Sequence, residues 1–192
     1  MFVLIENDSI TKTLSTSRGI TIGENQYPRA IYTLWSTAER EAIGIYEVVA
    51  DNSNFKDQEF YINTNQSFGF ADGVVTASYG SATARALADV TNEDDSITPG
   101  LKTQKKKNIK REAGGLLTPT DWYVIKATDV ESYSVPSAVS TFRANVRTRS
   151  NEMETAIDNA SDVDALASLY EYTEQADGSY TRPLGEFPTL EI

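Results

Sequence analysis

The sequence contains no cysteine and no histidine. Without thiols and imidazoles it cannot form a disulfide, a structural zinc site, or a Ser-His-Asp or Cys-His catalytic centre. Any general acid or base must therefore be a carboxylate, a lysine or a tyrosine. The lack of cysteine also fits a protein that is made and assembled in a reducing cytoplasm.

Long apolar runs are missing as well. The N-terminal run, Phe2–Ile5, is four residues long and has no basic flank, so we expect no signal peptide. A membrane span needs about 20 apolar residues, so we expect a soluble chain with no membrane partner. The 192 residues are 40% hydrophobic and 10% aromatic, which is enough for a packed core in one ordinary domain or two small ones.

The net charge of −11 predicts repulsion from nucleic acid, and we expect no nucleic-acid partner. One segment differs, because six of the 17 basic residues lie within residues 102–111. They are Lys102, Lys105, Lys106, Lys107, Lys110 and Arg111. This pattern is typical of a solvated helix face, and the alternative is a surface that docks on an acidic partner.

The first 90 residues have the pattern of a small β-rich domain with a short helix. Short apolar segments alternate with turn residues up to Ile22, which predicts a strand meander. Ser36 and Glu39 have the spacing of a capping box, and Gly44 follows as a helix stop. Asp72-Gly73 is a preferred pair for a type I′ hairpin turn.

The remaining chain divides into three further segments. Residues 91–100 are acidic and unpatterned, and we interpret them as a linker. Residues 101–172 have helical periodicity, and residues 173–192 are polar and contain proline and glycine, as in an extended tail. We therefore predict an α+β protein: a β-rich domain over 1–90, the linker, a helical hairpin region and a C-terminal tail.

A helical elbow is predicted around residues 116–127. The first helix should fray or bend at Gly114-Gly115, Pro119 should end it, and a second short helix should carry Trp122. The following long helix should carry an apolar stripe, Val139, Phe142, Val146, Met153 and Ile157. We expect Leu116, Leu117, Trp122 and Ile125 to pack against its first three members, Val139, Phe142 and Val146. The alternative is that Trp122 and Tyr123 contact a partner, since aromatic side chains anchor interfaces.

No motif predicts a cofactor or a metal. The glycine patterns of phosphate-binding loops are missing, and the acidic clusters lack the spacing of a calcium loop. A pair of carboxylates for glycoside hydrolysis is defined by its separation in space, so a small carboxylate-dependent hydrolase stays open as an alternative.

The segments KREAGGLLTPTDWYVIKA and VPSAVSTFRANVRTRSNEMETAI, with SDVDALASL after them, resemble the C-terminal region of small tail or tail-fibre assembly proteins of tailed bacteriophages. The matching positions are Leu116, Leu117, Thr120, Asp121 and Trp122, followed by Pro136, Phe142, Arg143, Val146 and Arg147. Phe142 stands where that family usually has tyrosine. The N-terminal strand and capped helix are also similar to such proteins, whereas residues 51–99 and the tail show no resemblance.

This resemblance implies a protein without catalytic activity, made in the host cytoplasm and located in the tail of the virion. It would bind other tail or fibre proteins, in several copies within a symmetric assembly. A fibre-assembly chaperone that leaves before maturation is the alternative. The residues that we expect to contact a partner are Trp122, Tyr123, Lys105, Lys106, Lys107, Lys110, Phe187, Leu190 and Ile192.

Overall fold

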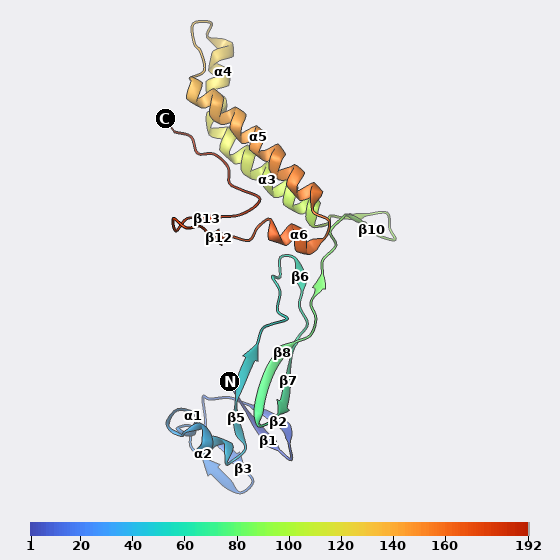
Figure 1. Cartoon of the computed structure of the whole chain (residues 1–192), viewed down its shortest axis with the longest axis vertical. Coiled ribbons are helices and arrows are strands. Elements are labelled where there is room, and N and C mark those ends of the chain that lie inside the picture. Colours follow the sequence, from blue (N-terminus) through green and yellow to red (C-terminus); the bar gives the residue numbers. More distant parts are fainter. Residues whose placement is uncertain (192) are drawn as a thin grey trace. The chain divides into compact units, whose positions relative to one another are not determined.

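The computed structural model describes residues 1–191, and the chain divides into two compact units, Met1–Thr83 and Ala84–Ile192. Helices make up 35% and strands 25% of the structure, which confirms the α+β class. Figure 1 shows the strands of the main sheet in the first unit and the long helices in the second. The division between the units comes before the predicted linker.

A five-stranded sheet forms the centre of the first unit. Its spatial order is β2 (Ser9–Leu14), β1 (Phe2–Glu6), β5 (Ile45–Asp51), β8 (Val74–Tyr79) and β7 (Gln66–Ala71). The pair β5 and β8 is parallel, and the other neighbours are antiparallel. The sheet curls, so that the edge strands β2 and β7 approach each other.

Strand β1 is buried on both faces. Phe2 and Leu4 pack in a cluster with Ile31 of the first helix, whereas Val3 packs with Val75 on the opposite face. This explains why Phe2–Ile5 is an uninterrupted apolar run, because successive side chains of a strand point to opposite faces. The N-terminal strand is thus a central element of the core.

The local signals in this unit are confirmed. Helix α1 (Ile31–Leu34) is followed by α2 (Thr37–Glu41), where Ser36 and Glu39 form both bonds of the capping box. Asp72 and Gly73 both have positive φ, as a type I′ turn requires. Gly44 also has positive φ, and a Cβ there would lie 2.6 Å from the carbonyl oxygen of Ile5.

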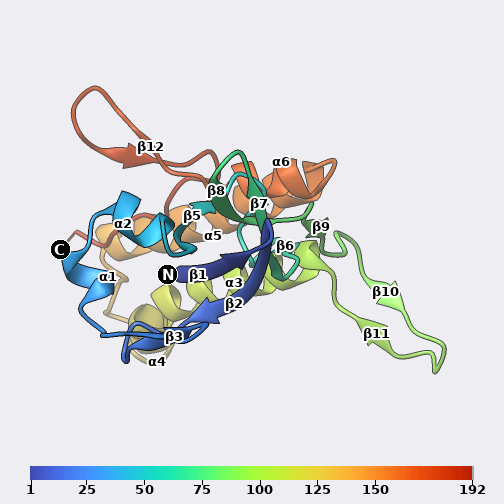
Figure 2. The same ribbon diagram turned by 90° about the horizontal axis from the view of Figure 1, so that it is seen from below.

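Four two-stranded ribbons complete the strands. They are β3 (Ile20–Ile22) with β4 (Asn25–Tyr27), β6 (Tyr61–Ile62) with β9 (Thr83–Ala84), β10 (Val90–Thr91) with β11 (Ile97–Thr98), and β12 (Thr173–Glu174) with β13 (Tyr180–Thr181). The sequence predicted a linker without regular structure over 91–100, but β10 and β11 form a hairpin over most of this segment. Its turn is stabilised by Ser96, whose N–H donates to the Asp94 carboxylate (3.1 Å). Figure 2 shows this hairpin projecting from the helices of its unit.

Two long helices, α3 (Leu101–Leu117) and α5 (Ser137–Asn159), lie side by side and build the core of the second unit (Figure 1). All five predicted stripe residues of α5 are buried. Helices α3 and α5 are joined by a 3-10 turn, η1 (Thr118–Thr120), and a short helix, α4 (Asp121–Asp129). Helix α6 (Val163–Ser168) follows α5. Helix α3 continues through Gly114-Gly115 to Leu117, so the predicted fraying at the two glycines is wrong.

The residue pattern favours Ser161 as the cap of α6 and Ser134 as the cap of α5, and the structure differs at both positions. The side chain of Asp162, not Ser161, accepts a hydrogen bond from the N–H of Ala165 (2.8 Å) and caps α6. Helix α5 begins after Pro136, and no side chain caps it, so Ser134 does not have the predicted role. The N-cap position lies one residue later than expected in α6 and two residues later in α5.

Candidate partner-binding site

The elbow between α3 and α5 is built by a short polar sequence. The Thr118 hydroxyl donates to the carbonyl oxygen of Gly114 (2.8 Å), and the Thr120 hydroxyl donates to that of Leu117 (2.7 Å). Pro119 has no N–H and cannot continue the helical hydrogen-bond pattern. The chain therefore turns through η1 and begins α4 at Asp121, which agrees with the predicted elbow.

Arg143 of α5 fixes this elbow in place. Its Nη1 donates to the carbonyl oxygen of Leu117 (2.9 Å) and to the Thr120 hydroxyl (2.6 Å), and it lies 2.8 Å from the Asp121 carboxylate. Arg143 is only 9% exposed. Because these bonds reach the last residue of α3, η1 and the first residue of α4, one guanidinium ties three consecutive elements to α5.

The sequence did not identify Arg143 as the residue that holds the elbow. The signal was its position, since Arg143 directly follows the buried Phe142 and lies three residues before the buried Val146. A side chain at the border of an apolar stripe reaches the neighbouring element while its stem stays covered. Arg147, one turn later, is exposed and donates only to the carbonyl oxygen of Arg143 (3.3 Å).

Helix α4 exposes its apolar side chains, and none of its residues is buried. Trp122 is 50% exposed and Ile125 is 61% exposed, and Val124 is exposed too. The prediction that Trp122 packs in the hairpin core is therefore wrong. The side chains of the four consecutive residues Trp122, Tyr123, Val124 and Ile125 point to different sides of the helix and together form an apolar surface around it, which we call the α4 face.

The core position expected for Trp122 is filled by other side chains. Phe142 and Val146 of α5 form a cluster with Ala113 of α3, and four further apolar side chains pack against it. These are Leu116, Leu117, Phe187 and Leu190. Since the end of α3 and the C-terminal tail cover this part of the stripe, the indole remains outside.

Aromatic contacts order the surface around the indole. The rings of Trp122 and Tyr123 are 3.8 Å apart between centroids. The ammonium group of Lys126 lies 5.8 Å from the Trp122 ring and 4.3 Å from the Tyr133 ring. Because Trp122 and Lys126 are four residues apart, they share one side of the helix. The α4 face is thus an ordered apolar surface beside one cation, which suits contact with a protein.

The predicted basic surface is largely used within the chain. Lys105 is 4% exposed, and its ammonium group lies 4.1 Å from the Tyr170 ring. Lys106 forms an ion pair with Asp158 (2.7 Å), which raises the pKa of the lysine, and Lys110 pairs with Glu154 (3.2 Å). Of the four candidate lysines, Lys107 and Lys110 are exposed.

This division follows from helical spacing. Lys106 and Lys110 are four residues apart, so they lie on one face of α3, and that face meets the carboxylates of α5. A solvated basic face and an acidic partner surface were the two predicted readings. The structure agrees with a solvated face at Lys107, Lys110 and Arg111, which are exposed. It also supplies carboxylate partners for Lys106 and Lys110 from α5 of the same chain.

The C-terminal candidates also have intramolecular contacts. Phe187 and Leu190 are partly buried against the α3 and α5 cluster, so the end of the tail folds back on the helices of its own unit. Leu184, just before them, is 2% exposed. Ile192 lies outside the described residues. The tail is therefore not simply extended, because it forms the β12 and β13 hairpin and then packs on the helices.

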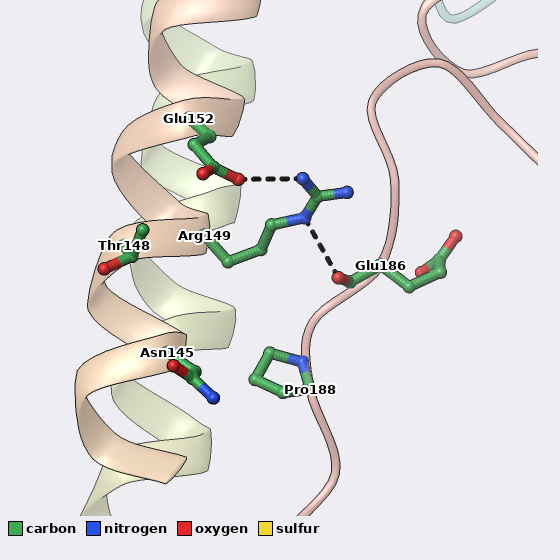
Figure 3. A pocket seen from close by; sticks show the side chains of 6 residues that line it. All are labelled: Asn145, Thr148, Arg149, Glu152, Glu186 and Pro188. Atoms are coloured by element: carbon green, nitrogen blue, oxygen red, sulfur yellow. Dashed lines mark hydrogen bonds and ion pairs between the residues drawn. The ribbon is translucent and has the colours of Figure 1, made fainter. Parts of the chain in front are cut away.

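An open cleft of about 300 Å³ lies between α5 and the tail (Figure 3). Its carboxylates are Glu152, which pairs with Arg149 (2.9 Å), and Glu186, which pairs with Arg182 (2.8 Å). A general acid of a glycosidase is kept protonated by apolar surroundings, which arginine partners oppose. The cleft thus offers no geometric support for the hydrolase alternative.

Over residues 1–191, no cluster of three or more acidic side chains has an arrangement that would hold a metal ion. Within the same residues, no helix is both long enough and apolar enough to cross a membrane. Comparison with protein-family models gives no match for the sequence. No curated protein and no solved structure matches it either.

Proposed function

We propose that this chain is a structural protein of a tailed-phage virion, without catalytic activity, that binds a tail or tail-fibre protein through the α4 face. The observation that carries the proposal is the contrast within the elbow. The buried Arg143 holds α4 at a defined place, yet α4 contributes no buried side chain to the core. A helix that is held firmly but buries none of its own side chains leaves its apolar side chains available to a partner.

The resemblance to phage tail proteins supports the same surface. The positions that carry it include Thr120, Asp121 and Trp122, together with Arg143. In this structure the Arg143 guanidinium contacts Thr120 and Asp121, and Trp122 follows them as the first apolar residue of the α4 face. The motif therefore combines residues that hold the elbow with the aromatic residue that the elbow displays.

The physical chemistry of the α4 face favours a protein partner. Hot spots of interfaces are enriched in tryptophan and tyrosine, which bury large areas with little loss of side-chain entropy. Lys126 beside the indole adds a positive charge at the rim, where a carboxylate of the partner would meet it. We therefore propose a partner surface with an apolar pocket and an acidic border.

The experiment is quantitative mass spectrometry of purified phage particles. We expect the wild-type chain in the particles and at least a tenfold lower copy number for Trp122→Glu. The matched control is Tyr180→Glu, a similarly exposed aromatic residue in the β12 and β13 hairpin, which should be incorporated normally. Both variants should keep the circular dichroism spectrum of the wild type.

Two outcomes would contradict the proposal. If the wild-type chain is abundant in infected cells but missing from purified particles, it acts as an assembly chaperone instead. If Trp122→Glu and Tyr180→Glu are incorporated equally well, the α4 face is not the contact surface.

A further inference from the structure

The last described residues form a strap across the two long helices. We define the strap as residues 185–191 and the strap site as the cluster of five apolar residues of α3 and α5 on which its side chains pack. These are Ala113, Leu116, Leu117, Phe142 and Val146. Phe187 and Leu190 of the strap pack there while remaining partly exposed.

The strap begins at a fixed point. Leu184 is buried, and its N–H donates to the carbonyl oxygen of Leu169 (3.0 Å). Gly185 follows with φ of +74°, and a Cβ at this position would lie 1.4 Å from Nη2 of Arg149. The turn at Gly185 therefore separates the anchored chain from the strap and lets the guanidinium lie against the backbone.

Arg149 is a polar clamp on the strap. Its Nε donates to the carbonyl oxygen of Glu186 (3.1 Å), and its Nη1 donates to the Glu152 carboxylate (2.9 Å). Figure 3 shows this side chain reaching from α5 to the strap across the open cleft of about 300 Å³. The strap is thus not close-packed on α5 at this level.

We infer from these contacts that the strap can leave the strap site while α3 and α5 stay folded. The strap site belongs to α3 and α5, whose packing includes Ile109, Met153 and Ile157, none of which is in the strap-site cluster. Leu184, which is anchored to Leu169, precedes the strap, so the part of the chain that can leave the helices begins at Gly185. Ordering each strap residue opposes binding, and only Phe187 and Leu190 offer apolar side chains to the cluster.

We propose that the strap site is a binding site for an extended Phe-x-x-Leu segment, and that its second occupant is the strap of another copy of this chain. The seated strap itself defines the chemistry, because an identical segment from another copy makes the same contacts. Exchange of an identical element between copies is a low-cost route to association. The chain's own strap then competes with the incoming one.

The first test is a binding measurement with a fluorescein-labelled peptide of residues 184–191. The probe is titrated against the full wild-type chain and against the full chain carrying F187A and L190A, which vacate the strap site. We expect the double variant to bind the peptide at least tenfold more tightly than the wild type. A peptide with alanine at both anchor positions should bind neither chain.

The second test uses the absence of cysteine from the chain. One copy carries Leu116→Cys and another carries Leu190→Cys. Both positions pack on the same cluster, so a strap that docks on a different copy brings the two thiols together. At high chain concentration we expect at least tenfold more cross-linked product than for Leu116→Cys mixed with Ser179→Cys, at the turn of the β12 and β13 hairpin. This measurement does not depend on whether the double variant folds.

Equal affinity of the peptide for the wild type and a folded double variant would show that the strap does not compete for the site. Equal cross-linking of Leu190→Cys and Ser179→Cys would show that straps do not exchange between copies. Either result overturns the proposal. Neither bears on the α4 face, whose role is measured by incorporation into particles.

Discussion

Replacing Arg143 by methionine should release the elbow. The change removes the guanidinium but keeps a long apolar stem beside Phe142. Two hydrogen bonds from a charged donor are lost, to the carbonyl oxygen of Leu117 and to the Thr120 hydroxyl. Bonds to charged groups contribute roughly 1.5–3 kcal/mol each, and losses from one donor do not add fully.

The geometry around Arg143 narrows this estimate. The Thr120 hydroxyl keeps its own bond to the Leu117 carbonyl oxygen after the change (2.7 Å). The Asp121 side chain is 52% exposed, so its ion pair with Arg143 contributes less than about 1 kcal/mol. We therefore expect Arg143→Met to lower the free energy of unfolding of the second unit by about 2–3 kcal/mol.

Urea denaturation followed by tryptophan fluorescence can measure this loss in the second unit. Trp35 lies in the first unit and Trp122 in the second, so a Trp35→Phe background leaves one reporter at the elbow. Arg147→Met is the matched control, and as a surface change it should stay within about 0.5 kcal/mol. A loss below about 0.5 kcal/mol for Arg143→Met would refute the idea that this guanidinium holds the elbow.

Three further predictions concern single positions. Trp122→Ala should cost less than about 1 kcal/mol in denaturant melts, because surface changes have small effects, and a loss of 3 kcal/mol would mean that the indole is buried. Gly114→Ala and Gly115→Ala should each stabilise the chain by roughly 0.5–1 kcal/mol, because both lie within α3 with open space at the Cβ position, and a lower melting temperature would contradict this. The Gly100 N–H donates to the Asp89 carboxylate (2.8 Å), and this bond lowers the pKa of Asp89 in the folded protein. The bond therefore stabilises the fold at a pH above the pKa that Asp89 has in the unfolded chain, and this stabilisation is lost as the pH falls through the pKa of Asp89 in the folded protein. Asp89→Asn should reduce the acid dependence of the melting temperature, and an unchanged dependence would contradict the assignment.

Local signals were read correctly from the sequence. The capping box at Ser36, the turn at Asp72-Gly73 and the stripe on α5 depend on neighbours within a few residues, and the structure has all three. The hairpin within 91–100 was missed because its strands are only two residues long and their side chains are exposed. Such strands leave no alternating apolar pattern.

The candidate site depended on contacts between distant segments, which sequence patterns do not specify. Trp122 looked like a core residue because the stripe on α5 required a cover. Leu116 and Leu117 cover the stripe as predicted, but the place expected for Trp122 is covered by a tail more than 40 residues further along the chain. The ion-pair partner of Lys106 also lies far away in the sequence, at Asp158 of α5. The helix positions were predictable, whereas the choice of partner was not.

The parallel pairing of β5 with β8 sets an order of events during synthesis. Strand β5 ends at Asp51, and its partner begins at Val74, so the ribosome must deliver the intervening segment before the pair can form. The antiparallel hairpin of β7 and β8 closes over a two-residue turn and is the faster step. We therefore expect β8 to arrive already paired with β7 and then to join β5. Until that moment β5 has an unpaired side in the nascent chain, and ribosome stalling before residue 79 would leave this edge open to aggregation.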